Sequence, residues 1–197
     1  MNKEKPKNRL TICICGMAGS GKSTLAKKLA KRYGLRYYSG GDALKALAMD
    51  EGYRPIEHGW WESQEGLRFL KKRAEDPQFD KKVDKKLLEL AGQGDVVLDS
   101  WTMPWLLKEG FKIWLEASLE KRAERIAKRD KISLDGALKA LESKEKQTEA
   151  IYRELYGFSL GEDFAPFKLI LDVDNLEARE VFRVLCAIMD NVIRKPS

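Results

Sequence analysis

Short apolar runs alternate with stretches of helical periodicity along most of the chain. Runs of this kind predict strands that are buried on both faces of a parallel sheet. The predicted strands are residues 10–15, 35–39, 96–99, 111–115 and 167–173. The predicted helices are residues 22–33, 42–51, 79–91, 118–129, 133–156 and 177–193. This alternation predicts an α/β three-layer sandwich, with about five parallel strands and helices on both faces. In such folds ligands bind beyond the carboxyl ends of the strands.

Residues 52–76 have a weaker pattern than the rest of the chain. They contain several aromatic side chains and Pro55, and helical periodicity returns only over residues 65–74. The ends of the other helices are better marked. Asp42 is predicted to cap one helix, Ser133 another, and Gly34 ends the helix that begins at Lys22.

Length and composition place the chain among globular proteins. Its 197 residues suit one domain, 1–197, and 43% hydrophobic with 35% charged residues gives an ion-rich globular chain. The net charge is +6 and the isoelectric point is about 9.1. A basic balance favours anionic ligands, either nucleotides or nucleic acid. The basic run at residues 3–9 is short, and we interpret it as a frayed terminus.

Cysteine usage and hydropathy indicate the compartment. Three cysteines without scaffold spacing favour a reducing environment, and Cys13 and Cys15 alternate on one face of a strand as small core residues. No signal peptide and no run of 18 apolar residues is present. We therefore expect a soluble cytoplasmic protein without a membrane segment.

The turn after the first predicted strand carries the strongest chemical signal. Residues 16–23, with the letters GMAGSGKS, fit the phosphate-binding pattern G-x-x-x-x-G-K-[ST] at every fixed position. Glycines allow several backbone N–H groups to point at phosphate oxygens, and the following helix presents its positive end to the same anion. Lys22 is expected to reach the β- and γ-phosphates and Ser23 to hold Mg²⁺. The predicted nucleotide-binding residues are Gly16, Ala18, Gly19, Ser20, Gly21, Lys22, Ser23 and Thr24.

This motif predicts a P-loop NTPase-type fold that binds ATP with Mg²⁺, but it does not identify the reaction. A GTPase would carry a guanine-reading Asn-Lys-x-Asp, which is absent from the sequence. A motor protein needs a larger core. Kinases of small molecules fit the length best.

Three arginines share one face of the helix predicted at residues 118–129. Arg122, Arg125 and Arg129 are spaced i, i+3 and i+7, so they lie within about 60° of one another. None has an acidic residue three or four positions away, which argues against a stripe of intrahelical ion pairs. We expect at least one of them to bind phosphate and to act in catalysis.

Acidic residues at strand ends are the candidate metal and acceptor ligands. Asp99 ends the apolar run Val96–Leu98, the usual place of an acid that holds Mg²⁺ or its waters, although a turn role is also open. Asp42 is either a helix cap or an acceptor contact. His58, the only histidine, is interpreted as a packing or surface residue.

Beyond the P-loop, the sequence resembles the nucleoside monophosphate kinases, and among them the archaeal type of cytidylate kinase. The resemblance runs from about residue 10 to residue 193. It is carried by residues 38–42 (YSGGD), 77–80 (PQFD) with Asp84, 96–98 (VVL), 122–129 (RAERIAKR), Tyr152 and 156–157 (YG). It implies a monophosphate-binding segment at about 39–92 and a lid at about 122–157. It also implies acceptor-binding roles for Ser39, Asp42, Lys45, Asp80 and Asp84.

Three positions depart from this family pattern. Lys45, Trp101 and Ile151 stand where the resemblance implies arginine. Lysine keeps the charge but loses the bidentate fork, and the other two lose the charge altogether. Arg153, Arg54 or Arg68 is predicted to take over contact with the acceptor phosphate.

Three functions remain open at this point. The first is transfer from ATP to CMP, or to dCMP or UMP, by a monomeric nucleoside monophosphate kinase. The second is phosphorylation of a hydroxylated metabolite with an Asp as general base. The third is a nucleotide-binding regulator or RNA-associated protein, which the absence of an aromatic-basic RNA signature disfavours.

Overall fold

The computed structural model describes residues 10–56, 59–61 and 63–194. His58 and the basic run at residues 3–9 lie outside this part of the chain. Five parallel strands form one sheet in the order β2-β3-β1-β4-β5. They are β1 (Thr11–Cys15), β2 (Arg36–Ser39), β3 (Val96–Asp99), β4 (Phe111–Glu116) and β5 (Leu169–Asp172). The predicted α/β fold with a five-stranded parallel sheet is confirmed.

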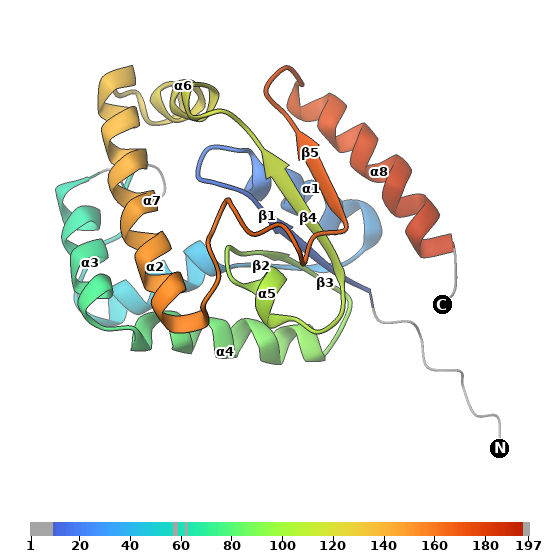
Figure 1. Cartoon of the computed structure of the whole chain (residues 1–197), viewed down its shortest axis with the longest axis horizontal. Helices are drawn as coiled ribbons and strands as arrows, with labels where there is room; N and C mark the ends of the chain where they lie inside the picture. Colours follow the sequence, from blue (N-terminus) through green and yellow to red (C-terminus); the bar gives the residue numbers. More distant parts are fainter. Residues whose placement is uncertain (1–9, 57–58, 62, 195–197) are drawn as a thin grey trace.

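Helices cover both faces of this sheet (Figure 1). Side chains of α1 (Lys22–Tyr33) and α8 (Ala178–Arg194) pack on one face around Ile12 and Ile14. On the other face, Cys13 packs with α2 (Gly40–Asp50) and α4 (Gln78–Gly92). Cys15 lies on this same face against the end of α7 (Leu134–Tyr156), so both cysteines are core residues, as predicted.

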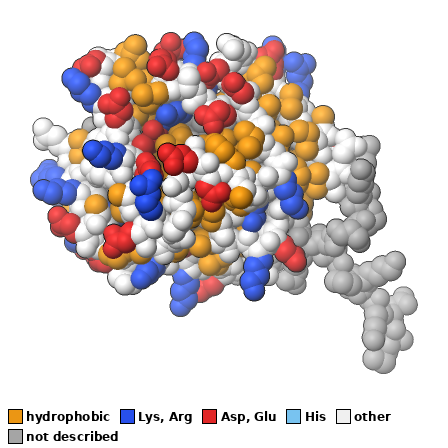
Figure 2. Space-filling model, in the orientation of Figure 1, with side chains coloured by type: hydrophobic (Ala, Val, Ile, Leu, Met, Phe, Trp, Pro, Cys, Tyr) orange, Lys and Arg blue, Asp and Glu red, His pale blue; other side chains and the backbone are white. Residues whose placement is uncertain are grey.

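The remaining helices stand around the carboxyl ends of the strands. α6 (Leu119–Asp130) and α7 pack on each other and on the turn after β1, and α3 (Gln64–Glu75) packs on α7. α5 (Met103–Leu106) is a single turn that the sequence pattern did not predict. On the side seen in Figure 2, basic and acidic side chains are interspersed with apolar patches. No helix in the described part of the chain combines the length and apolarity needed to cross a membrane.

One predicted cap is wrong. Ser39, not Asp42, is the N-cap of α2, and its Oγ accepts a hydrogen bond from the Asp42 backbone N–H at 3.1 Å. Asp42 therefore lies in the first helical turn, where its negative charge faces the positive end of the helix. The Asp42 side chain is exposed there.

Candidate active site

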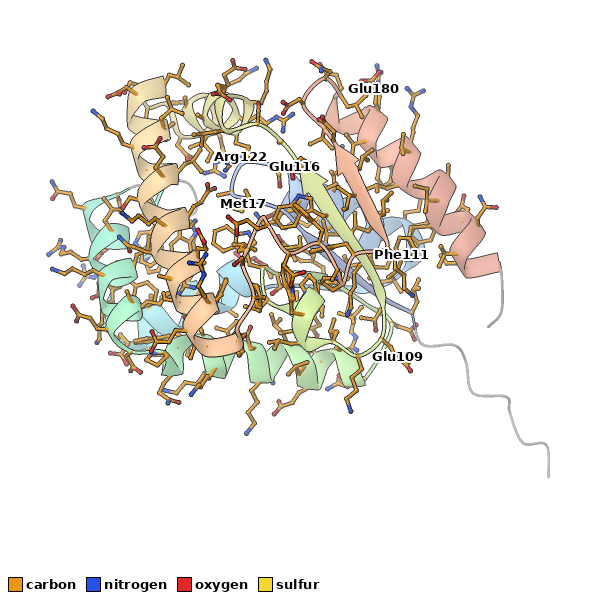
Figure 3. All side chains as sticks on the ribbon, viewed as in Figure 1. Met17, Glu109, Phe111, Glu116, Arg122 and Glu180 are labelled. Atoms are coloured by element: carbon orange, nitrogen blue, oxygen red, sulfur yellow. The ribbon has the colours of Figure 1, made fainter. Side chains whose placement is uncertain are left out.

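The turn between β1 and α1 has a backbone that only glycine adopts at three positions. Gly16, Gly19 and Gly21 have φ of 149°, 85° and 92°. A Cβ atom at Gly16 would lie 2.6 Å from the carbonyl oxygen of Leu115, and one at Gly19 would lie 2.8 Å from that of Arg122. The turn is thus packed closely between β4 and α6, and Figure 3 labels Met17 of the turn and Arg122 of α6.

Polar groups converge inside this turn. The Ser20 Oγ is buried and has no hydrogen-bond partner among the described residues. The Lys22 ammonium has a weak contact to the carbonyl oxygen of Met17, at 3.4 Å. An orphaned hydroxyl, an adjacent cation and the N-terminus of α1 together fit the oxygens of a polyphosphate.

A cavity of about 940 Å³ opens from this turn across the carboxyl ends of the strands. Most residues predicted from the sequence lie in its wall, on both the nucleotide and the acceptor side. They are Ala18, Gly19, Ser20, Gly21, Lys22, Ser23, Thr24, Ser39, Asp42, Lys45, Asp80, Asp84, Asp99, Arg125 and Arg129. Gly16, Arg122 and Arg153 lie outside the described lining.

Asp99 and Ser23 face the same cavity. Asp99 ends β3 beside Ile14 of β1, is buried, and accepts a hydrogen bond from the Tyr37 hydroxyl at 3.2 Å. Burial and the nearby Asp99 charge raise the pKa of Tyr37, which keeps that hydroxyl a donor. Within the described chain, no group of three or more His, Cys, Asp or Glu side chains could hold a metal ion. Mg²⁺ needs few protein ligands when phosphate oxygens and water supply the rest, so Ser23 and Asp99 fit it.

All three arginines of α6 have partners: Arg122 and Arg125 contact other segments, and Arg129 contacts the adjacent Asp130. Arg122 is buried and forms an ion pair with Glu145 of α7, and it also donates to the carbonyl oxygen of Ala18 at 3.2 Å. Arg125 donates to the carbonyl oxygen of Val173 at 2.7 Å. Burial raises the pKa of Glu145, while Arg122 opposes that shift.

Arg129 is paired with its neighbour Asp130, at 2.8 Å. Helical spacing predicted that the three arginines share one face of a helix. Of the three, Arg125 and Arg129 line the cavity and Arg122 does not. Arg122 instead holds the turn after β1 to α7.

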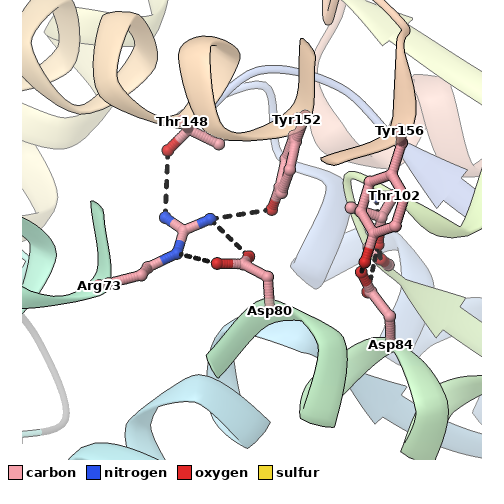
Figure 4. Close-up of polar contacts among 8 residues, drawn as sticks. Arg73, Asp80, Asp84, Thr102, Thr148, Tyr152 and Tyr156 are labelled. Carbon is pink, nitrogen blue, oxygen red and sulfur yellow. Dashed lines mark hydrogen bonds and ion pairs between the residues drawn. The ribbon is translucent and has the colours of Figure 1, made fainter. Parts of the chain in front are cut away.

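A buried guanidinium that the sequence pattern did not single out stands at the far end of the cavity. Arg73 of α3 is 3% exposed and contacts three side chains from two other helices (Figure 4). It binds both oxygens of Asp80, at 2.9 and 2.7 Å, and donates to the Thr148 hydroxyl at 3.2 Å and the Tyr152 hydroxyl at 3.1 Å. Burial lowers the pKa of Arg73, but Tyr152 and Asp80 raise it further, so the side chain stays charged.

Asp84 lies one helical turn beyond Asp80 on α4 and has only hydroxyl partners. It accepts hydrogen bonds from Thr102 at 2.5 Å and Tyr156 at 2.6 Å (Figure 4). Burial raises the pKa of Asp84 to about 6, against the lowering effect of both hydroxyls. The two acceptor-side carboxylates thus differ, because one is neutralised by a guanidinium and the other is not.

The positions that depart from the family pattern are filled in different ways. Lys45 donates to the carbonyl oxygen of Ile56 at 3.2 Å. Trp101 and the buried Ile151 pack in the same apolar cluster. Arg153, predicted to replace the missing guanidiniums, is exposed and forms an ion pair with Glu149.

Arg54 and Arg68 are also exposed and lie outside the described lining of the cavity. Arg73, in contrast, lines the cavity. The sequence held a sign of its burial, since helical spacing places Arg73 on the same face of α3 as the apolar Phe69 and Leu70.

The fold and the phosphate-binding turn define a P-loop nucleotide-binding protein of the kinase type. Among solved structures, shikimate kinase from Acinetobacter baumannii in complex with shikimate has a TM-score of 0.57 at 17% identity, covering 95% of this chain and 97% of that one. TT1252 from Thermus thermophilus has a TM-score of 0.56 at 19% identity, covering 94% and 99%. These likenesses concern the fold alone.

Sequence comparison identifies the family. The model of the cytidylate kinase-like family matches residues 11–175, and the chain belongs to that family. Cytidylate kinase of Pyrococcus horikoshii is 33% identical over 189 residues, which cover 95% of this chain and 92% of that protein. Cytidylate kinase of Methanocaldococcus jannaschii is 34% identical over 188 residues, covering 93% and 99%. The predicted resemblance to archaeal cytidylate kinases is confirmed.

Proposed function

We propose that the protein is a cytidylate kinase that converts ATP and CMP to ADP and CDP, with dCMP and UMP as further candidate acceptors. The observation that carries this proposal is one cavity that runs from Lys22 in the phosphate-binding turn to Asp80 and Asp84 on the acceptor side. Cytidylate kinases among the relatives support a nucleotide acceptor over the hydroxylated metabolite and over a regulatory or RNA-associated role.

On the donor side, backbone N–H groups of residues 16–22, the Ser20 hydroxyl and the Lys22 ammonium bind the polyphosphate. Ser23 and Asp99 would hold Mg²⁺, which supplies neutralisation of the charge on the β- and γ-phosphates. The buried Asp99 keeps a fixed position through its contact with Tyr37.

On the acceptor side, the monophosphate of CMP is already an anionic nucleophile, so no general base is required. One of its oxygens forms a bond to the γ-phosphorus while the bond from that phosphorus to the β,γ-bridging oxygen breaks, and ADP leaves with the electron pair. Catalysis then consists of alignment and charge neutralisation by Lys22, Arg125 and Arg129. The carboxylates of Asp80 and Asp84 accept hydrogen bonds, which suits an amino group on the acceptor base.

The chain is proposed to act as a single domain and a cytoplasmic monomer. Residues 39–92 form the monophosphate-binding segment and residues 122–157 the lid. Contacts of Thr148 and Tyr152 with Arg73 join these two segments on the acceptor side. Closing of the lid would therefore be coupled to filling of the acceptor end of the cavity.

The deciding experiment is direct measurement of phosphoryl transfer from ATP to CMP, dCMP and UMP beside a panel of hydroxylated metabolites. Saturable formation of CDP at micromolar CMP supports the proposal. Transfer only to a hydroxylated metabolite would contradict it, and in that case Asp42→Asn should abolish activity, because an alcohol requires a base.

A further inference from the structure

Trp101 connects the phosphate-binding turn to the end of β3. Its indole Nε1–H donates to the carbonyl oxygen of Gly16 at 2.6 Å. Gly16 is the first residue of the turn and is itself held against Leu115, so this bond fixes the place where the turn leaves the sheet. The indole also lies in the wall of the cavity.

Two ammonium groups lie against the ring of Trp101. Lys22 Nζ is 5.4 Å from the ring centre, and Lys144 Nζ, which comes from α7, is 5.6 Å from it. Lys144 is also 4.6 Å from the ring centre of Trp61. Both lysines and both indoles line the cavity, and a cation from α1 and a cation from α7 both lie near the ring of Trp101.

This arrangement stands where the family resemblance implies a guanidinium. Trp101 fills that position, and Ile151, the second such position, packs in the same apolar cluster. The two changes belong together, because an arginine at 151 would place a charge among the aromatic side chains of that cluster. Lys22 and Lys144 bring positive charge to the ring of Trp101 from other parts of the chain.

Resting on the proposed transfer to a nucleoside monophosphate, we propose that Trp101 is a positioning residue for Lys22 and Lys144, and that Lys144 binds the phosphate of the acceptor. The ring attracts both ammonium groups and limits where each can lie. Two like charges near one ring repel each other, and an anion that binds close to both ammonium groups reduces that repulsion. The γ-phosphoryl group and the acceptor phosphate are the two anions that this reaction brings there.

The chain offers a matched control for each residue. Trp105 lies in the same apolar cluster as Trp101 and donates its Nε1–H to Asp163 at 2.7 Å, but it is not among the described lining residues of the cavity. Lys139 lies on the same helix as Lys144 and is 75% exposed. The variants are Trp101→Leu, Trp105→Leu, Lys144→Met, Lys144→Arg and Lys139→Met.

Three quantities are measured for each folded variant: the Kd for ATP with Mg²⁺ and no acceptor, the KM for CMP, and kcat. Trp101→Leu should raise the Kd for ATP roughly 3- to 30-fold, the range of one desolvated cation–π contact. Lys144→Met should raise the KM for CMP about tenfold with the Kd for ATP unchanged, and Lys144→Arg should restore most of the loss. Trp105→Leu and Lys139→Met should leave all three quantities within about twofold.

Equal effects of Trp101→Leu and Trp105→Leu on the Kd for ATP would overturn the positioning role, since both changes remove an indole from one cluster. An unchanged KM for CMP in Lys144→Met would overturn the role of Lys144. Wild-type protein that binds ATP without phosphorylating CMP would contradict the proposed function and, with it, the assignment of Lys144. The ATP affinities need no acceptor and would still decide the role of Trp101.

Discussion

The donor end and the acceptor end of the cavity are built in different ways. The donor end is one continuous turn of backbone, residues 16–23. Its N–H groups are proposed to bind the polyphosphate, and its glycines allow the backbone to adopt the required shape. The acceptor end is assembled from side chains of α3, α4 and α7, with Arg73 at the point where the three helices meet.

This difference determines how each end tolerates change. A local turn keeps its shape when one ligand-binding side chain is removed, because the backbone of that turn is fixed by its own glycines. A buried network shared by three helices loses structure together with function, since each member leaves a partner unsatisfied. Loss of a ligand-binding side chain at the donor end should therefore lower activity in folded protein, and loss of a member of the Arg73 network should lower stability as well.

The largest effect is expected for Arg73→Met. The change leaves the Asp80 carboxylate buried without its cation, which costs about 3–5 kcal/mol in the free energy of unfolding. The double variant Arg73→Met/Asp80→Leu removes both charges and should recover most of that loss. Chemical denaturation measures both, with the exposed Arg68→Met on the same helix as the control. A loss below about 1 kcal/mol would show that this end is not held by the ion pair.

Lys22→Ala tests the donor end in the opposite sense. Turnover should fall at least about a hundredfold, the scale of losing one preorganised charge at the transferring group. The free energy of unfolding should change little, because the contacts of Lys22 within the protein are a weak one of 3.4 Å to the backbone and one to the ring of Trp101 at 5.4 Å. Lys31→Ala, on the exposed side of the same helix, is the control for both measurements. Full turnover in folded Lys22→Ala protein would refute the assignment.

Asp84 gives the acceptor end a pH dependence. Its pKa is about 6 in the folded protein, against about 3.9 for an ordinary Asp. Between these values the unfolded chain releases the proton while the folded protein keeps it, so the free energy of unfolding falls as pH rises from about 4 to 6.

Asp84→Asn should remove that slope and raise the free energy of unfolding at pH 7 by about 3 kcal/mol. Denaturation curves across this pH range measure both effects, and Asp50→Asn on the exposed side of α2 provides the control. An unchanged slope in Asp84→Asn would mean that another group titrates.

The same contrast explains what the sequence could predict. The phosphate-binding turn is contiguous, so its residues, the strand before it and the helix after it were all placed correctly. The partners of Arg73 could not be predicted, because they lie 7, 75 and 79 positions away and no local pattern records a contact between separate helices. The ion pair of Arg122 was not predicted for the same reason, since Glu145 is 23 positions distant.

The cap of α2 is a different kind of error. Ser39 and Asp42 are spaced like the first and last residues of a capping box, and both can cap a helix. Ser39 is the cap because it has an extended backbone just before the helix, from which its hydroxyl accepts a hydrogen bond from the N–H of Asp42. That outcome was accessible from the spacing alone, whereas the ion pairs were not.

The proposed lid, residues 122–157, contributes Arg125 and Arg129 of α6 and Tyr152 of α7 to the cavity wall, and we expect its arginines to have different roles. Arg125→Ala should lower kcat about tenfold, more than it raises the Kd for ATP, since contacts to the transferring group tighten in the transition state. Arg122→Ala should mainly lower stability, because it leaves Glu145 unpaired. Lys128→Ala, exposed on the same helix, controls for helix propensity. Unchanged kcat in Arg125→Ala and Arg129→Ala would mean that this helix face is only solvated.

The smallest effect is expected for Arg153→Ala, and it sharpens the comparison most at the acceptor end. The side chain is 59% exposed and pairs with Glu149 on its own helix, an arrangement worth at most about 0.5 kcal/mol. Ile151, two positions earlier, points into the core, so the helix turns Arg153 away from the cavity. The KM for CMP should stay within about twofold, while Lys144→Met raises it about tenfold. A tenfold rise in Arg153→Ala would mean that closing of the lid rotates this part of α7 into the site, and the acceptor phosphate would then be bound by a guanidinium after all.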